Sequence, residues 1–273
     1  MSVRVVVDGL GFTEGPVALA DGRIALASIS HGCVYVVDPR NTASLQKFVT
    51  GGGPNGLAAG DDGALYVAQN GGIWGAPTKV PAGVQVIRDG RVEHLVEGMG
   101  APNDVVVGPD GRLWVTDTVA EVVWSDPGSG RAGQVHVVDP HSGTARCVLD
   151  EGPVFTNGLA FDASGARLLL TATRSAVLWA YDVTDAGLLG ARQLVTFDGG
   201  SPDGMERAAN GRFWVALLGA DRLDLVDPED GVVGAVPLPS GSLPTNVCRD
   251  HDGSGLFVTA GHAGALLHVR LGR

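Results

Sequence analysis

The sequence predicts an all-β fold, a six-bladed β-propeller of four-stranded antiparallel blades that forms a single domain over residues 1–273. Short β-rich runs of about five to eight residues fill the chain, and long helical periodicity is nearly absent. Glycine accounts for 42 of the 273 residues, which indicates many tight turns. A segment of common pattern also recurs six times, at intervals of 41 to 54 residues. A period of this length, with about four strands per unit, is typical of a propeller blade.

The expected strands are runs rich in β-branched, aromatic and other apolar residues, each bounded by Gly, Asp, Asn or Pro. The N-terminal run 3–10 is expected to pair with 265–271, which closes the ring and removes a sheet edge. We find no linker and no second domain in the sequence. In chain order, the other expected strands are 23–28, 33–38, 64–69, 84–88, 112–117, 134–139, 167–172, 176–183, 212–217, 222–227 and 255–260.

The six repeated segments share one internal order: a polar opening residue, a first strand, a tight turn and a second strand. Asp-Gly and Asn-Gly turns, as at 21–22 and 210–211, favour the hairpin that joins the two strands. Since the strands run in opposite directions, the start of the first and the end of the second lie on the same face. The opening residues therefore converge at one mouth of the channel. The segments are 13–28, 54–69, 102–117, 156–172, 202–217 and 244–260.

Composition narrows the possible partners and the compartment. The net charge of −11 argues against nucleic acid or an anionic membrane as a partner, because both require a basic patch. Cys33, Cys147 and Cys248 lie far apart, which indicates a reducing compartment rather than a disulfide framework. With no signal-peptide core and no apolar run of about 18 residues, cytoplasmic localisation is expected. We expect a small-molecule substrate and a monomer or small homo-oligomer.

The second position of every repeated segment carries an oxygen donor. Hard oxygen donors of this kind suit Ca²⁺, Mg²⁺ or Mn²⁺ and disfavour a thiolate-type zinc site. Two carboxylates would neutralise a divalent cation, and neutral amides would complete its shell without adding repulsion. For any single Asn or Asp before glycine, the alternative is that it is an ordinary turn residue. The six residues are Glu14, Asn55, Asn103, Asn157, Asp203 and Thr245.

Four motifs, in this order and spacing, give the chain a family resemblance: FTEGP at 12–16, APND at 101–104, FTNGL at 155–159 and SPDGM at 201–205. The chain resembles the senescence marker protein/gluconolactonase/luciferin-regenerating enzyme family over essentially its whole length. The resemblance implies a six-bladed propeller with one divalent cation at the channel mouth, Ca²⁺ first, with Mg²⁺, Mn²⁺, Zn²⁺ or Fe²⁺ as alternatives. Matched motif by motif, the implied metal ligands are Glu14, Asn103, Asn157 and Asp203.

Further residues near the predicted mouth are candidates for substrate contact. Trp74 and Trp124 are candidate apolar walls, with packing on the blade surface as the alternative for Trp74. The longest interval between segments holds the loop 119–133, which is expected to act as a lid and specificity element. A turn, a surface salt bridge or an ordinary loop position is the alternative for each polar candidate. The predicted substrate-binding residues are Asn55, Asp104, Arg174, His31, His262 and Glu121.

The predicted function is metal-dependent hydrolysis of a lactone, either a sugar lactone or another γ- or δ-lactone. The cation would polarise the carbonyl, and water would attack it. The resemblance implies Asp203 as the catalytic general base. A metal-bound carboxylate has a depressed pKa, which opposes that role. Three alternatives stay open: a phosphotriesterase-like hydrolase, a non-hydrolytic isomerase or cyclase, and a metal-binding propeller without turnover.

Overall fold

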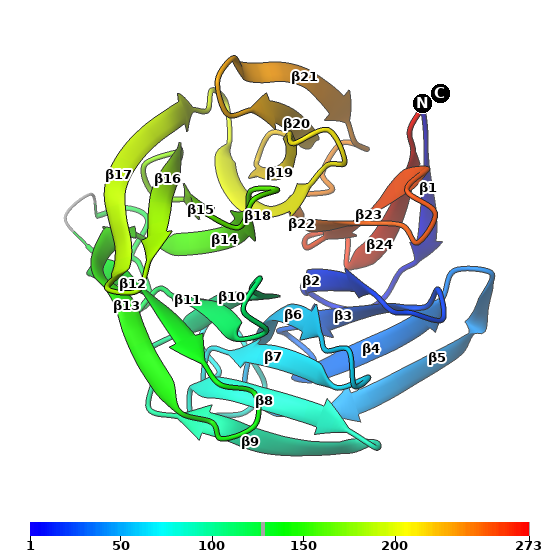
Figure 1. Cartoon of the computed structure of the whole chain (residues 1–273). Coiled ribbons are helices and arrows are strands. Elements are labelled where there is room, and N and C mark those ends of the chain that lie inside the picture. The colour runs from blue at the N-terminus through cyan, green and yellow to red at the C-terminus, as the bar shows by residue number, and fades with distance from the viewer. Residues whose placement is uncertain (127–128, 273) are drawn as a thin grey trace.

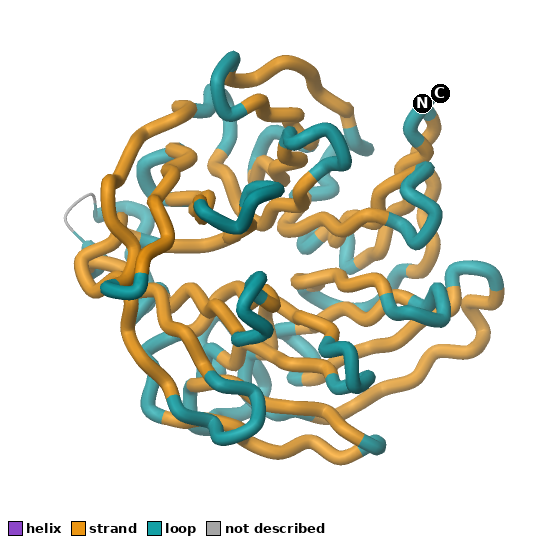
Figure 2. The backbone as a smooth tube through the Cα atoms, in the orientation of Figure 1, coloured by secondary structure: helices purple, strands orange, loops and turns teal. Residues whose placement is uncertain are grey.

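Six four-stranded antiparallel sheets surround a central channel in the computed structural model, which describes residues 1–126 and 129–272 (Figure 1). The described residues form strands and loops and contain no helix (Figure 2). The predicted all-β, six-bladed propeller is thereby confirmed. Within these residues there is accordingly no helix of the length and apolarity needed to cross a membrane.

Each blade begins at the channel and proceeds outward through four strands. The first blade holds β2 (Thr13–Ala18), β3 (Ile24–Ser28), β4 (Cys33–Asp38) and β5 (Asn41–Val49). The second holds β6 (Pro54–Ala59), β7 (Leu65–Gln69), β8 (Gly83–Arg88) and β9 (Arg91–Glu97). The third holds β10 (Pro102–Val107), β11 (Leu113–Asp117), β12 (Ala132–Val138) and β13 (Ala145–Val154).

The remaining blades repeat this order. The fourth holds β14 (Thr156–Phe161), β15 (Arg167–Ala172), β16 (Val177–Thr184) and β17 (Gly187–Thr196). The fifth holds β18 (Ser201–Arg207), β19 (Phe213–Leu218), β20 (Arg222–Asp227) and β21 (Gly231–Pro237). The sixth holds β22 (Pro244–Arg249), β23 (Gly255–Ala260), β24 (Ala265–Arg270) and, from the other end of the chain, β1 (Ser2–Val7).

The ring closes as the sequence predicts. Strand β1 pairs antiparallel with β24, with Val3 opposite Val269 and Val5 opposite Leu267. The two ends of the chain therefore lie side by side at the outer edge of the sixth blade (Figure 1). Six apolar clusters hold the ring together, and each combines residues from two neighbouring blades. The core is thus distributed between the blades rather than gathered at one centre.

The innermost strand of every blade is irregular at the residues that open the repeat. In the first blade the register shifts between Glu14 and Val17, and in the third between Pro102 and Val105. The other four inner pairs shift at the equivalent place. A bulge of this kind redirects a side chain that regular pleating would point to the face of the sheet. The repeated irregularity therefore aims the opening side chains at the channel.

Glycine follows the opening residue in four blades, where the inner strands approach closely. A Cβ built on Gly158 would lie 2.7 Å from the Cα of Gly204, and one on Gly15 would lie 2.6 Å from the Cα of Gly56. Real Cβ atoms do not approach backbone so closely, so these positions require glycine. The inner strands can therefore lie this close together only because these positions lack a side chain.

The third and sixth blades carry larger residues at this equivalent position, Asp104 and Asn246. Their side chains occupy the space that the neighbouring glycines leave, because a Cβ on Gly56 would meet Asp104 and one on Gly204 would meet Asn246. The Nδ2 group of Asn246 donates to Oδ2 of Asp104 across the channel at 3.4 Å. The pair thus spans the channel directly behind the opening residues.

The close packing of glycine predicts the effect of a single added methyl group. We expect Gly158→Ala to lower the free energy of unfolding by about 1–3 kcal/mol, because the methyl group overlaps the backbone of the fifth blade. Gly234→Ala, in the outer strand β21, is the matched control, since its Cβ would meet only Leu225 at 3.8 Å. Urea unfolding of both variants measures the difference. Equal stability of the two variants would show that the inner ring is not close-packed.

Candidate functional site

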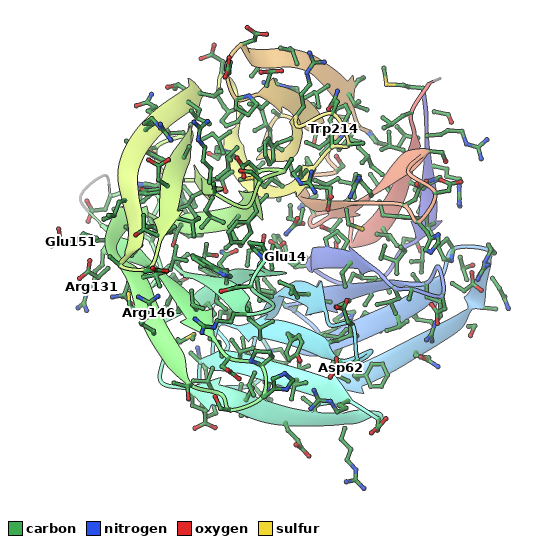
Figure 3. The ribbon with its side chains drawn as sticks, in the orientation of Figure 1. Glu14, Asp62, Arg131, Arg146, Glu151 and Trp214 are labelled. Carbon is green, nitrogen blue, oxygen red and sulfur yellow. The ribbon has the colours of Figure 1, made fainter. Side chains whose placement is uncertain are left out.

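A cavity of about 420 Å³ opens at the channel mouth where the inner strands begin. Five of the six opening residues line it, and the sticks in Figure 3 place Glu14 near the centre of the ring. The sixth, Thr245, lies beside them and is fully buried, with its hydroxyl 2.9 Å from the carbonyl oxygen of Thr13. The five lining residues are Glu14, Asn55, Asn103, Asn157 and Asp203.

The two carboxylates of the cavity are buried close to a third, with no cation among the described lining residues. Glu14 is 5% exposed and Asp203 is 2% exposed. Burial raises the pKa of Glu14 well above its ordinary value, and the charges of Asp203 and Asp104 raise it further. Hydrogen bonds from Gly15 and Thr245 act in the opposite direction. The arrangement is therefore costly while both carboxylates are ionised and uncompensated.

Asp203 is positioned by the neighbouring blade and keeps one oxygen without a partner. The hydroxyl of Thr171 donates to the Asp203 carbonyl oxygen at 2.7 Å, and that of Thr173 to the Pro202 carbonyl oxygen at 2.8 Å. Its buried Oδ1 atom has no hydrogen-bond partner. Burial and the charge of Asp104 raise the pKa of Asp203 well above its ordinary value, while a hydrogen bond from Asn157 lowers it. A buried carboxylate oxygen without a hydrogen bond is unfavourable, so this atom is a candidate for binding a donor or a cation.

The amides of the cavity have oxygens available to such a partner. Nδ2 of Asn157 donates to Oγ1 of Thr173 at 3.0 Å, which fixes the orientation of the amide. The buried Oδ1 of Asn55 has no hydrogen-bond partner. Two carboxylates with neutral amide oxygens form a donor set that suits a hard divalent cation, which would also neutralise the buried charge. Among the described residues, no three His, Cys, Asp or Glu side chains are placed so that they could hold a metal ion together, so the amides are needed to complete a site.

Asp104 does not line this cavity, although it is next to Asn103. It lines a hollow at the other end of the channel, where its Oδ1 accepts from the backbone N–H of Val105 at 2.9 Å. Burial raises its pKa to about 7. Its charge still reaches Glu14 and Asp203. Asp104 therefore acts on the site through electrostatics and through the channel-spanning bond to Asn246.

The structure also places the other predicted substrate contacts outside the cavity lining. Arg174 donates to the carbonyl oxygens of Trp124 at 3.1 Å and Asp126 at 2.6 Å, so it holds a loop. Nδ1 of His31 lies 2.9 Å from the hydroxyl of Tyr35. Glu121 and His262 are exposed. Of the predicted substrate contacts, Asn55 is the one that lines the cavity together with the four predicted metal ligands.

An apolar wall completes the cavity. Trp74 and Trp124 line it, as expected, while residues 127 and 128 of the predicted lid lie outside the described part of the chain. The sequence reasoning missed five apolar lining residues. Their positions in the repeat could have identified them. Three lie two residues before an opening residue, and two lie at or just after the end of the second strand of a blade. The five are Phe12, Phe155, Leu243, Ile29 and Leu218.

Comparison with known proteins identifies a family for the chain. The family model described as SMP-30/Gluconolactonase/LRE-like region matches residues 12–262. A 6-deoxy-6-sulfogluconolactonase from Pseudomonas putida is 32% identical over 143 residues, which cover 50% of this chain and 46% of that protein. The match therefore spans less than half of the length of that relative.

Two further proteins match almost the whole chain. A gluconolactonase from Zymomonas mobilis is 24% identical over 291 aligned positions, which cover 95% of this chain and 79% of that protein. The structure of regucalcin from Agrobacterium tumefaciens, described as a calcium-binding protein, aligns with a TM-score of 0.80 at 18% identity. That alignment covers 98% of this chain and 93% of regucalcin, and it shows a shared fold.

The raised pKa values predict how the stability of the metal-free protein depends on pH. Because the folded state holds protons that the unfolded state releases near pH 4, the free energy of unfolding falls as pH rises. For Asp104 this loss runs from its ordinary value of 3.8 to about 7. Thermal unfolding of chelator-treated protein between about pH 5 and pH 8 measures it. Added Ca²⁺ should restore stability most at the high end, where the carboxylates are ionised.

Glu14→Gln is the matched variant for this experiment. It removes one buried charge while keeping the shape of the side chain, so we expect a flatter dependence of the melting temperature on pH and a weaker response to Ca²⁺. A melting temperature that is independent of pH in the native protein would contradict the buried-carboxylate interpretation. So would an unchanged response to Ca²⁺ in the variant.

Proposed function

Because the chain belongs to the SMP-30/gluconolactonase/LRE-like family, we propose that it is a metal-dependent hydrolase that opens a lactone. The observation that carries the proposal is the buried Oδ1 of Asp203, which lacks a partner in a cavity shared with Glu14 and three amides. Family relatives named as gluconolactonases support the reaction class. The donor set supports the metal.

We propose one divalent cation, Ca²⁺ in the first instance, held by the four residues that the family motifs indicate. A structural neighbour is described as a calcium-binding protein, which is consistent with this choice. When bound, the cation would supply a Lewis acid for the lactone carbonyl and for the negative charge that develops on its oxygen. The proposed ligands are Glu14, Asn103, Asn157 and Asp203.

The protein itself would contribute a base and a water-excluding surface. Asp203 would accept a proton from the attacking water, whose oxygen forms a bond to the carbonyl carbon. The ring C–O bond then breaks, and the leaving oxygen takes back the proton held by Asp203, which gives a hydroxy acid and restores the carboxylate. Coordination lowers the pKa of a carboxylate, whereas burial and the charge of Asp104 raise the pKa of Asp203. Burial and the charge of Asp104 would thus oppose the loss of basicity that coordination causes.

The decisive variant is Asp203→Asn, which keeps the shape of the side chain and removes its ability to accept a proton. We expect turnover of a γ- or δ-lactone to fall by about 10²–10⁴ in protein loaded with metal, because a positioned base contributes roughly this factor. A pH-indicator assay measures acid release, and calorimetry measures Ca²⁺ occupancy.

Asp104→Asn is the control for a lost nearby charge, since Asp104 lies outside the cavity lining. We expect its turnover to change far less than that of Asp203→Asn. Retained turnover in metal-loaded Asp203→Asn would reject the assignment of the base. Native protein that binds Ca²⁺ but hydrolyses no lactone would reject the proposed function.

A further inference from the structure

Three aromatic rings form a continuous wall on one side of the cavity: Trp74, Phe155 and Trp124, here called the aromatic wall. The ring of Phe155 lies between the two indoles, with centroid distances of 5.5 Å to each. The ring planes are tilted by 40° and 48°. Since the three residues come from three different blades or their loops, the wall is assembled by the tertiary fold.

The wall is held in place by backbone and side-chain constraints. Trp74 and Phe155 have φ angles of 59° and 61°, a region that bulky residues rarely adopt. Such conformations persist only where the surrounding structure enforces them, and they concentrate at functional sites. The guanidinium of Arg174 lies 5.4 Å from the centroid of the Trp124 ring and donates to the Trp124 carbonyl oxygen. Arg174 is thereby engaged with the loop that carries Trp124.

The opposite side of the cavity is apolar as well, through Phe12, Ile29, Leu218 and Leu243. Apart from the oxygen donors proposed as ligands, polar side chains are contributed to the described lining by Asn55 and Ser201. No Lys, Arg or His belongs to that described lining. The cavity thus combines an oxygen-rich floor with an apolar surround that offers few hydrogen-bond donors.

This combination discriminates between kinds of lactone. A polyhydroxylated lactone would bury several hydroxyl groups against apolar side chains, which is unfavourable without matching hydrogen bonds. A substrate with a carboxylate or sulfonate would find no Lys, Arg or His in the described lining to pair with it. A neutral lactone with an alkyl or aryl substituent would instead bury that substituent against the wall, which is favourable in proportion to its apolar area.

We propose that the substrate is a neutral lactone that carries an apolar alkyl or aryl substituent, which packs on the aromatic wall. This inference rests on the proposed lactone hydrolysis and names the class of its substrate. The cavity volume of about 420 Å³ is within the usual range for small-molecule sites. The 6-deoxy-6-sulfogluconolactonase to which the chain is similar would then act on a substrate of different chemistry, judged by its name.

Steady-state kinetics of the Ca²⁺-loaded protein test the substrate class directly. The panel contains δ-lactones with side chains of increasing length, a phenyl-substituted lactone, glucono-δ-lactone and a lactone carrying a carboxylate. We expect kcat/KM to rise by about fourfold for each buried methylene, the factor that corresponds to its transfer free energy. Glucono-δ-lactone and the carboxylated lactone should be at least tenfold poorer. Preference for either of these two would overturn the inference while leaving lactone hydrolysis intact.

Variants of Trp124 connect the preference to the wall. Trp124 is 54% exposed, so Trp124→Ala should fold, and it should lose more kcat/KM on long-chain lactones than on unsubstituted ones. Trp124→Phe should recover most of the difference. Val123→Ala is the matched control, because Val123 is 56% exposed in the same loop and does not line the cavity. An equal loss on all lactones in Trp124→Ala would argue against contact between the wall and the substituent.

A binding experiment separates failure of the inference from failure of the proposed function. Lactams resist hydrolysis and keep the ring and carbonyl, so calorimetry can compare an alkyl-substituted lactam with the polyhydroxylated gluconolactam. Tighter binding of the alkyl lactam, weakened in Trp124→Ala and kept in Val123→Ala, would support the inference even if no lactone is hydrolysed. Tighter binding of gluconolactam would overturn it.

Discussion

The close approach of the six inner strands is the constraint from which the rest of the structure follows. Four glycines allow the strands to approach until backbone nearly meets backbone, as at Gly158 and Gly204. Asp104 and Asn246 then fill the space that the glycines leave and bond across the channel. The opening residues lie on the mouth side of this pair, where five of them line the cavity. The position of the candidate site is therefore a consequence of how narrow the ring is.

The close approach of the inner strands also affects the pKa values of the carboxylates in the site. Glu14 and Asp203 are brought together in a buried place where neither has a cationic side chain as partner. The pKa of each rises because burial favours the protonated form, and nearby negative charge adds to this. The added charge is that of Asp203 and Asp104 for Glu14, and that of Asp104 for Asp203. A scaffold that only needed stability would place apolar residues here, since an uncompensated buried charge is expensive. The proposed divalent cation would compensate the charge of both carboxylates.

Much of the fold could be predicted because the opening residues and the hairpin turns recur in each blade and make the repeat visible in the sequence. The prediction of ring closure by residues 3–10 is confirmed by the pairing of β1 with β24. The outer strands of five blades, such as β5 and β9, were not identified individually, because they are largely exposed and lack an apolar run. The five opening residues of the cavity could be predicted from register alone, since residues at equivalent blade positions share one level of the ring.

Register does not determine which way a side chain leaves the backbone or what a loop residue contacts. Asp104 is adjacent to Asn103 but lines the hollow at the opposite end of the channel. The register shifts between Pro102 and Val105, so regular alternation does not give the direction of either side chain. Arg174 follows a second strand, as a substrate-binding residue would, yet its guanidinium is engaged with loop carbonyl groups.

The apolar surround of the cavity has a consequence for the chemistry at its floor. The proposed cation would interact more strongly with its carboxylate ligands and with the lactone carbonyl when water is excluded, because the local dielectric constant is lower. The aromatic wall and the opposite apolar side chains exclude water from the mouth once a substituent fills it. The same contact that selects an apolar substituent would therefore also strengthen the electrostatic interactions of Glu14 and Asp203. Under this proposal, selectivity and rate would both depend on one surface, and a substrate without the substituent would lose both.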